Sequence, residues 1–315
     1  MTILTVRHVT TYRYRRPVAL GEHRMMFRPR DSYDQRLVDS RLRITPEPVH
    51  LHWIHDPFGN CVALARFKTR ASELRFESTI RVDHYPDNVP DFQTDPRAKT
   101  YPFVYDADEM PDLMASIARG YPDPDGEIDH WVRRFLLPGR PTPTGKLLMT
   151  LTSAIKEGFS YTRRSEHGTQ DPVATVRTGR GSCRDFALLM MEAVRSLGLA
   201  ARFVSGYLYV PSRDLFGEGG GHMGGERVGG EHVGGGSTHA WCQIYLPGAG
   251  WVEFDPTNGI IGNRDLIRVA VARDPSQAVP LSGTYAGSPD DELGMKVQVN
   301  VEAEAQSEDA DAAKA

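Results

Sequence analysis

One stretch of the sequence, residues 179–190, constrains the fold most, because it places a cysteine in the first turn of a buried helix. A glycine-rich loop ends at Ser182, a favourable N-cap, and Asp185 stands three residues later, where a capping carboxylate is expected. Nearly every residue that follows, up to Leu197, is apolar. We therefore predict a helix that starts near Cys183 and is packed on most of its sides.

This position has a chemical consequence for Cys183. Backbone N–H groups at the start of a helix have no intrahelical partner and carry partial positive charge. A thiol at such a place loses its proton more readily, and the same N–H groups can bind the oxyanion of a tetrahedral intermediate. A lone cysteine is often an inert core residue instead. The catalytic interpretation therefore depends on partner residues elsewhere in the chain.

The composition limits the kinds of partner and compartment. A chain of 315 residues is long enough for about two domains. The net charge of −4 and the pI of about 6.3 give no indication of nucleic acid or of an anionic membrane as partner. No run of about 18 apolar residues predicts a membrane span, and the first residues lack the apolar segment of a signal peptide. Cys61, Cys183 and Cys242 are far apart, so we expect free thiols and a cytoplasmic protein.

Residues 1–105 are predicted to form an N-terminal β domain followed by a linker. Short runs rich in β-branched and aromatic residues alternate with Pro, Gly and Asn turns, which is typical of an antiparallel sandwich. His50, His52 and His55 lie on one of these predicted strands. No cysteine or carboxylate completes a metal-ligand set around them, so we expect structural histidines.

The rest of the chain divides into a second domain, residues 106–285, and a C-terminal segment, residues 286–315. Within the second domain, residues 217–236 contain eleven glycines and are interpreted as a mobile insertion between two strands. His222 and His232 lie in this insertion, and its flexibility argues against a metal site. The C-terminal segment is predicted to be a strand followed by an acidic, disordered tail. No cofactor and no metal ion is predicted.

A predicted hairpin brings two further candidate residues together. His239 opens one strand and Asp255 closes the next, so both lie at the same end of the hairpin. A three-residue loop, residues 247–249, would set Leu246 opposite Gly250 and would place both side chains on one face of the sheet. His239 and Asp255 would then be diagonal neighbours, about 7–8 Å apart between backbones, which an Asp–His hydrogen bond can span.

These residue types are the set that cysteine-dependent acyl transfer needs: a nucleophile, a base and a group that orients the base. Cys183 would attack an acyl carbon, His239 would hold the thiolate and protonate the leaving amine, and Asp255 would fix the imidazole tautomer. Each residue alone has an ordinary structural explanation, but the combination favours a catalytic site. Trp241 and Tyr161 could line it, although core packing is the simpler interpretation for both.

In four ordered blocks the sequence resembles the bacterial transglutaminase-like superfamily. The blocks are residues 181–187 (GSCRDFA), 195–207 (RSLGLAARFVSGY), 238–241 (THAW) and 250–259 (GWVEFDPTNG). The strand-rich start of the chain is similar to the β domain that precedes the core in one bacterial branch. The glycine-rich insertion before His239 departs from the family pattern.

The resemblance implies an α+β fold, in which an N-terminal antiparallel β-sandwich precedes a papain-like transglutaminase core. In that core the helix that carries the cysteine packs on an antiparallel sheet, and Cys183, His239 and Asp255 form a triad. The family includes cross-linking enzymes, peptidases, amidases and members with no known reaction, so the resemblance fixes the chemistry better than the substrate. We expect hydrolysis of a peptide or protein amide. A protein-glutamine transglutaminase, and a non-catalytic interaction protein on the same fold, are the alternatives.

Overall fold

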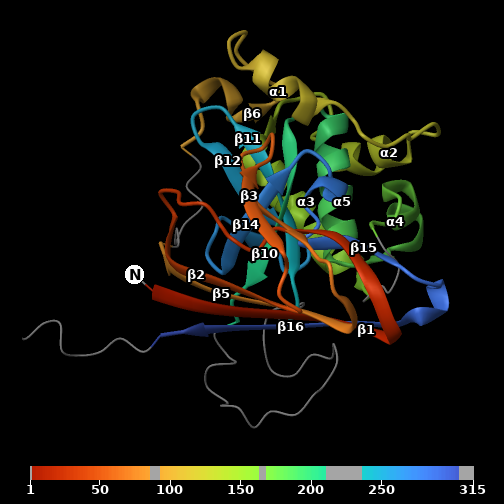
Figure 1. The fold of residues 1–315 in the computed structure, drawn as a ribbon. Helices are drawn as coiled ribbons and strands as arrows, with labels where there is room; N and C mark the ends of the chain where they lie inside the picture. Colours follow the sequence, from red (N-terminus) through yellow and green to blue (C-terminus); the bar gives the residue numbers. More distant parts are fainter. Residues whose placement is uncertain (1, 86–92, 163–167, 211–235, 305–315) are drawn as a thin grey trace, which may run out of the picture.

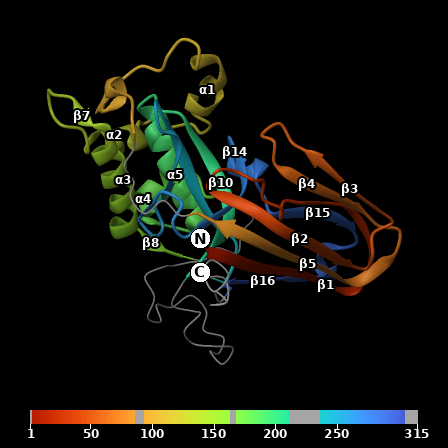
Figure 2. The ribbon, with the colours of Figure 1, turned by 90° about the vertical axis from the view of Figure 1, so that its left-hand side faces the viewer.

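A computed structural model describes residues 2–85, 93–162, 168–210 and 236–304. A strand-rich region and a mixed region of helices and sheet lie side by side (Figures 1 and 2). The predicted α+β fold is confirmed. The glycine-rich insertion with His222 and His232, and the acidic end of the chain, fall almost entirely outside the described residues.

The N-terminal β domain is built around one long strand, β1, which takes part in both of its layers. The first half of β1 pairs with β5 and β16, and its last residues pair with β4 and β15. The two layers face each other, since the ring of His23 near the end of β1 and the ring of Phe76 on β5 lie 5.6 Å apart between centroids. Among the described residues the strands of this antiparallel sheet are β1 (Thr2–Met25), β2 (Gln35–Thr45), β3 (His50–His55), β4 (Cys61–Arg66), β5 (Arg70–His84), β15 (Leu281–Ala286) and β16 (Glu292–Ala303).

The end of the chain belongs to this N-terminal sheet, which corrects the predicted division at residues 106–285 and 286–315. Strand β16 runs along β1 from Leu4 to Tyr14, and β15 pairs with the other end of β1. The cause is burial: the alternating valines of β16 need an apolar face, and Val299 packs with Leu4 and Val6. Such a pairing joins residues almost 300 positions apart, so no local sequence pattern predicts it.

The second region packs its helices on an antiparallel sheet with the strand order β13-β12-β11-β10-β14. Helix α5 is apolar on nearly all sides, and it contacts α2, α3 and α4 as well as β10 and β11. The elements are α1 (Met110–Ile117), α2 (Glu127–Arg133), α3 (Thr144–Gly158), α4 (Pro172–Thr178), α5 (Cys183–Ser196), β10 (Ala201–Leu208), β11 (His239–Leu246), β12 (Gly250–Asp255), β13 (Ile260–Ile261) and β14 (Leu266–Ala272). Shorter elements are β6 (Thr100–Tyr101), β7 (Thr142–Pro143), β8 (Ser160–Tyr161), β9 (Arg180–Gly181) and the 3-10 helices Pro96–Ala98, Pro275–Gln277 and Pro289–Asp291.

The two regions meet along β10 and β14. Leu4 and Val6 of the β domain share an apolar cluster with Tyr207 and Ile267 of the second sheet. A polar contact crosses the same boundary, where His8 Nδ1 lies 2.9 Å from the Tyr207 hydroxyl. The β domain therefore supports the sheet that carries the candidate site.

Candidate active site

The start of helix α5 holds the candidate nucleophile as the sequence predicts. Ser182 is the N-cap in an extended conformation, and the helix begins at Cys183. Both the backbone N–H and the hydroxyl of Ser182 donate to Asp185 Oδ2, each at 2.8 Å. The other oxygen of Asp185 accepts the Gln170 N–H at 2.6 Å. Because this buried carboxylate ties the loop to the first helical turn, the Cys183 thiol is held at a defined place.

Position 181, in the loop before the cysteine, has room for glycine only. A Cβ atom on Gly181 would lie 2.9 Å from the Asp185 Cβ and 3.1 Å from a ring carbon of Phe186. Strand β9 also pairs in parallel with β8, and the Gly181 carbonyl accepts the Thr162 N–H at 2.8 Å. The backbone of β9 is thus pressed against the helix start, where a side chain would displace the nucleophile.

The β11–β12 hairpin brings the other two candidates together in the predicted register. Leu246 lies opposite Gly250, so the loop has three residues, and this confirms the register derived from strand parity. His239 Nε2 lies 2.8 Å from Asp255 Oδ2, and both side chains are fully buried. The predicted Asp–His hydrogen bond is therefore present.

Asp255 is kept ionised by the turn that follows it. Its Oδ1 accepts the Thr257 N–H at 2.9 Å, and its Oδ2 accepts the Asn258 side-chain amide at 2.8 Å. Burial favours the protonated acid, but the charge of His239 and these hydrogen bonds outweigh it and lower the pKa of Asp255. We did not predict a role for Asn258. The sequence feature that could have indicated this role is the position of Asn258, three residues after the aspartate in a turn that folds back on the carboxylate.

The ring of His239 is oriented by these contacts. With Nε2 bonded to Asp255, Nδ1 is the ring nitrogen left for the thiol, and a hydrogen bond with Cys183 contributes to the pKa of His239. Burial alone would lower the pKa of His239. The Asp255 carboxylate and, to a smaller extent, Cys183 reverse that effect and raise the pKa to about 10. The site therefore favours an imidazolium beside the ionised Asp255.

A buried polar network supports the histidine from behind. The Trp241 indole stacks on the His239 ring, 5.9 Å between centroids, and its N–H donates to Glu253. Glu253 also accepts from Arg268, which in turn donates to Asp34 of the β domain at 2.8 Å. Trp241 is thus a core residue that contacts the site from within. No sequence pattern singles out Arg268, because its partners come from two distant parts of the chain, residues 32–35 and Glu253.

Tyr161 lies near the start of α5, where it pairs with Gly181 and packs on Phe186, 6.5 Å between ring centroids. The histidines of β3 belong to the other domain. His50 and His52 share an exposed face of β3, with ring centroids 4.9 Å apart. Within the described ranges, no group of three or more His, Cys, Asp or Glu side chains has the arrangement of a metal site. None of the described helices is both long enough and apolar enough to cross a membrane.

The other two cysteines differ from Cys183 in their surroundings. All three are free thiols, which confirms that prediction. Cys242 is completely buried in β11, and burial raises the pKa of its thiol well above its ordinary value. Cys61 is half-buried in β4 of the other domain. Of the three thiols, only that of Cys183 contributes to the raised pKa of His239, the histidine bonded to Asp255.

Two family models match two separate parts of the chain. Residues 4–83 match the bacterial transglutaminase-like N-terminal region, and residues 136–256 match the transglutaminase-like superfamily. The chain belongs to this superfamily, whose core is a cysteine-dependent catalytic fold. Both matches contain residues predicted above: the first covers β1 to β5, and the second includes Cys183, His239 and Asp255.

One relative and one solved structure match nearly the whole chain, and a second relative matches a shorter stretch. An uncharacterized protein of Mycobacterium tuberculosis is 28% identical over 304 residues, which cover 93% of this chain and 91% of that protein. An uncharacterized protein of Mycobacterium leprae is 38% identical over 120 residues, which cover 38% of this chain and 37% of that protein. A solved structure described as a candidate cysteine protease from Cytophaga hutchinsonii superposes with a TM-score of 0.66. Its identity is 18%, and the match covers 95% of this chain and 90% of that one. This last likeness shows the shared fold.

Proposed function

We propose that the protein hydrolyses an amide bond of a peptide or protein through a thioester on Cys183. The observation that carries this proposal is the place of His239. Its ring is bonded through Nε2 to a buried, ionised aspartate, while Nδ1 stays available to a thiol at the start of a helix. A purely structural histidine has no need of this polarised arrangement.

The first half of the reaction forms the acyl-enzyme. The Cys183 thiolate attacks the amide carbon, so that a bond from Sγ to carbon forms and the carbonyl oxygen becomes an oxyanion. Backbone N–H groups in the first turn of a helix have no intrahelical partner, and those at the start of α5 would stabilise that charge. The His239 imidazolium then gives its proton to the amide nitrogen, the carbon–nitrogen bond breaks, and the amine leaves.

The second half restores the enzyme. Neutral His239 takes a proton from a water molecule, whose oxygen attacks the thioester carbon. The carbon–sulfur bond breaks, the Cys183 thiolate returns beside the imidazolium, and the acid product leaves. Throughout the cycle Asp255 keeps Nε2 occupied, so the proton moves through the other nitrogen.

A product analysis in isotopically labelled water tests this proposal and its alternatives. The protein is incubated with a digest of casein and a primary amine in water enriched in oxygen-18, and the products are identified by mass spectrometry. Hydrolysis predicts new peptide ends that carry oxygen-18, formed by the wild type and by the control variant Cys61→Ala but absent in Cys183→Ala. Amine-coupled glutamine without new ends would show a transglutaminase, and no products from a folded wild type would favour an interaction protein.

A further inference from the structure

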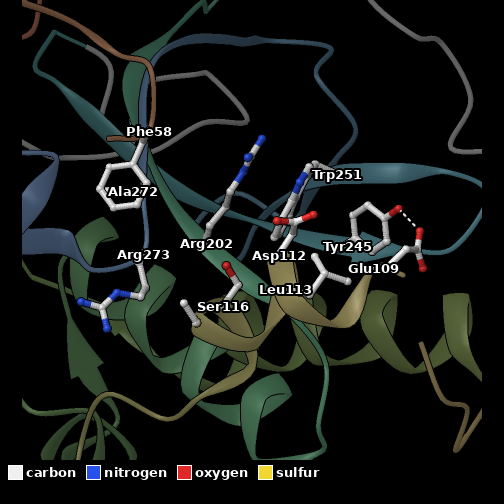
Figure 3. A pocket seen from close by; sticks show the side chains of 11 residues that line it. Phe58, Glu109, Asp112, Leu113, Ser116, Arg202, Tyr245, Trp251, Ala272 and Arg273 are labelled. Atoms are coloured by element: carbon white, nitrogen blue, oxygen red, sulfur yellow. Dashed lines mark hydrogen bonds between the residues drawn. The ribbon is translucent and has the colours of Figure 1, made fainter. Parts of the chain in front are cut away.

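A cavity of about 410 Å3 lies at the end of the β11–β12 hairpin remote from His239. Helix α1, the start of β10 and the start of β12 surround it, and Phe58 reaches in from the β domain (Figure 3). Tyr245, which lines the cavity, is six residues along β11 from His239, or about 20 Å along the strand. The cavity is therefore separate from the candidate active site.

Arg202 is the side chain that gives this cavity its chemistry. Its guanidinium lies on the Trp251 indole, 4.2 Å from the ring centroid, and its Nε donates to Gln243 Oε1 at 2.5 Å. Gln243 is itself fixed, because its amide donates to Glu253 Oε1 at 2.6 Å. The fork of terminal amino groups is thus held in one orientation before any ligand arrives.

No acceptor in the described part of the chain binds those two terminal amino groups, and Arg202 has no carboxylate at ion-pair distance there. Burial lowers the pKa of Arg202 to about 10, although the charge of Glu253 opposes this. The carboxylate of Glu253 is already shared among Trp241, Gln243 and Arg268. A half-buried cation without a counter-ion is unfavourable, which is typical of a group that binds an anion.

The lining selects among anions. A planar guanidinium fork matches a carboxylate or a phosphate with two parallel hydrogen bonds. Glu109, which accepts the Tyr245 hydroxyl, and Asp112 of α1 add negative charge to the wall and disfavour a doubly charged phosphate. The remaining wall is apolar or aromatic, with Phe58, Leu113 and Trp251. We propose that Arg202 and this cavity bind a monocarboxylate with an apolar body, such as the C-terminal residue of a peptide.

Calorimetric titration with two matched probes tests the proposal. The probes are N-acetyl-phenylalanine and N-acetyl-phenylalaninamide, which differ in the carboxylate, and the protein carries Cys183→Ala so that neither probe is processed. We expect the acid to bind at least about tenfold more tightly than the amide. Arg202→Met should abolish that preference, because the variant keeps contact with Trp251 but loses the fork.

The controls separate a built site from general charge attraction. Arg273 also lines the cavity but points away from Arg202 in Figure 3, so Arg273→Gln should retain the preference for the acid. Equal binding of the acid by Arg202→Met, or an equal loss in Arg273→Gln, would overturn the proposal. Tighter binding of inorganic phosphate than of the acid would overturn the assignment to a carboxylate. The readout is binding by an inactive variant, so the result is independent of the proposed hydrolysis.

Discussion

Replacement of Asp255 by asparagine should change the pH dependence of Cys183 more than any other single isosteric change. The carboxylate is the main group that raises the pKa of His239 to about 10 against the effect of burial. Without it, burial leaves that pKa at or below the ordinary 6.5. The difference between about 10 and 6.5 corresponds to on the order of 5 kcal/mol in favour of the imidazolium. The variant therefore loses the cation that holds the thiolate near neutral pH.

The assay for Asp255→Asn is the rate of alkylation of Cys183 by iodoacetamide from pH 5 to 10, followed by peptide mass spectrometry. The wild type should react at pH 6, whereas the variant should need a pH about one to three units higher for the same rate. Asp39→Asn, which removes an exposed carboxylate that pairs with Arg41 on β2, serves as the matched control and should behave as the wild type. Superimposable profiles for the wild type and folded Asp255→Asn would refute this account of the histidine.

Three further predictions concern stability. Gly206→Ala should lower the free energy of unfolding in urea by about 1–3 kcal/mol, because its Cβ would lie 2.1 Å from the Ile267 carbonyl oxygen and 2.7 Å from the Trp241 ring; an unchanged midpoint would contradict the packing described. Glu253→Gln should lower it by about 3 kcal/mol, since Trp241 and Arg268 lose a buried anion, and a neutral result in the same assay would show that the network is dispensable. Burial lowers the pKa of His8 to about 4, so the folded state favours its neutral form, and the stability it contributes above pH 6.5 should disappear as the pH falls from 6.5 to 4. His8→Gln should flatten that part of the pH profile of thermal unfolding, and a profile as steep as that of the wild type would show that other groups cause it.

The parts of the site that the sequence predicts are those set by short-range rules. The cap of α5 involves residues three positions apart, and the hairpin register follows from strand parity and loop length. Ser182, Asp185 and the His239–Asp255 pair therefore lie where the sequence places them. Asn258 was also within reach, since it follows Asp255 by three residues, but its role depends on a turn geometry that residue types alone do not specify.

The parts that the sequence does not predict depend on contacts between distant segments. Strand β16 pairs with β1 across almost the whole chain, and either strand could satisfy its alternation with another partner. Arg268 has an ordinary strand position. It joins the buried network behind His239 only because the fold brings Glu253 and Asp34 within hydrogen-bond distance of it. The free fork of Arg202 is equally invisible, because a missing partner is a property of the folded surroundings.

The most direct test of the central claim is to trap the acyl-enzyme. The protein is mixed with p-nitrophenyl acetate at neutral pH, quenched in acid within the first turnover and digested for mass spectrometry. We predict one acetyl group on Cys183 as a thioester that hydroxylamine removes. The label should be absent from Cys61 and Cys242, and should decay in the wild type as water releases it. A wild type that is folded but carries no thioester on Cys183, or carries it equally on all three cysteines, would contradict the proposed mechanism.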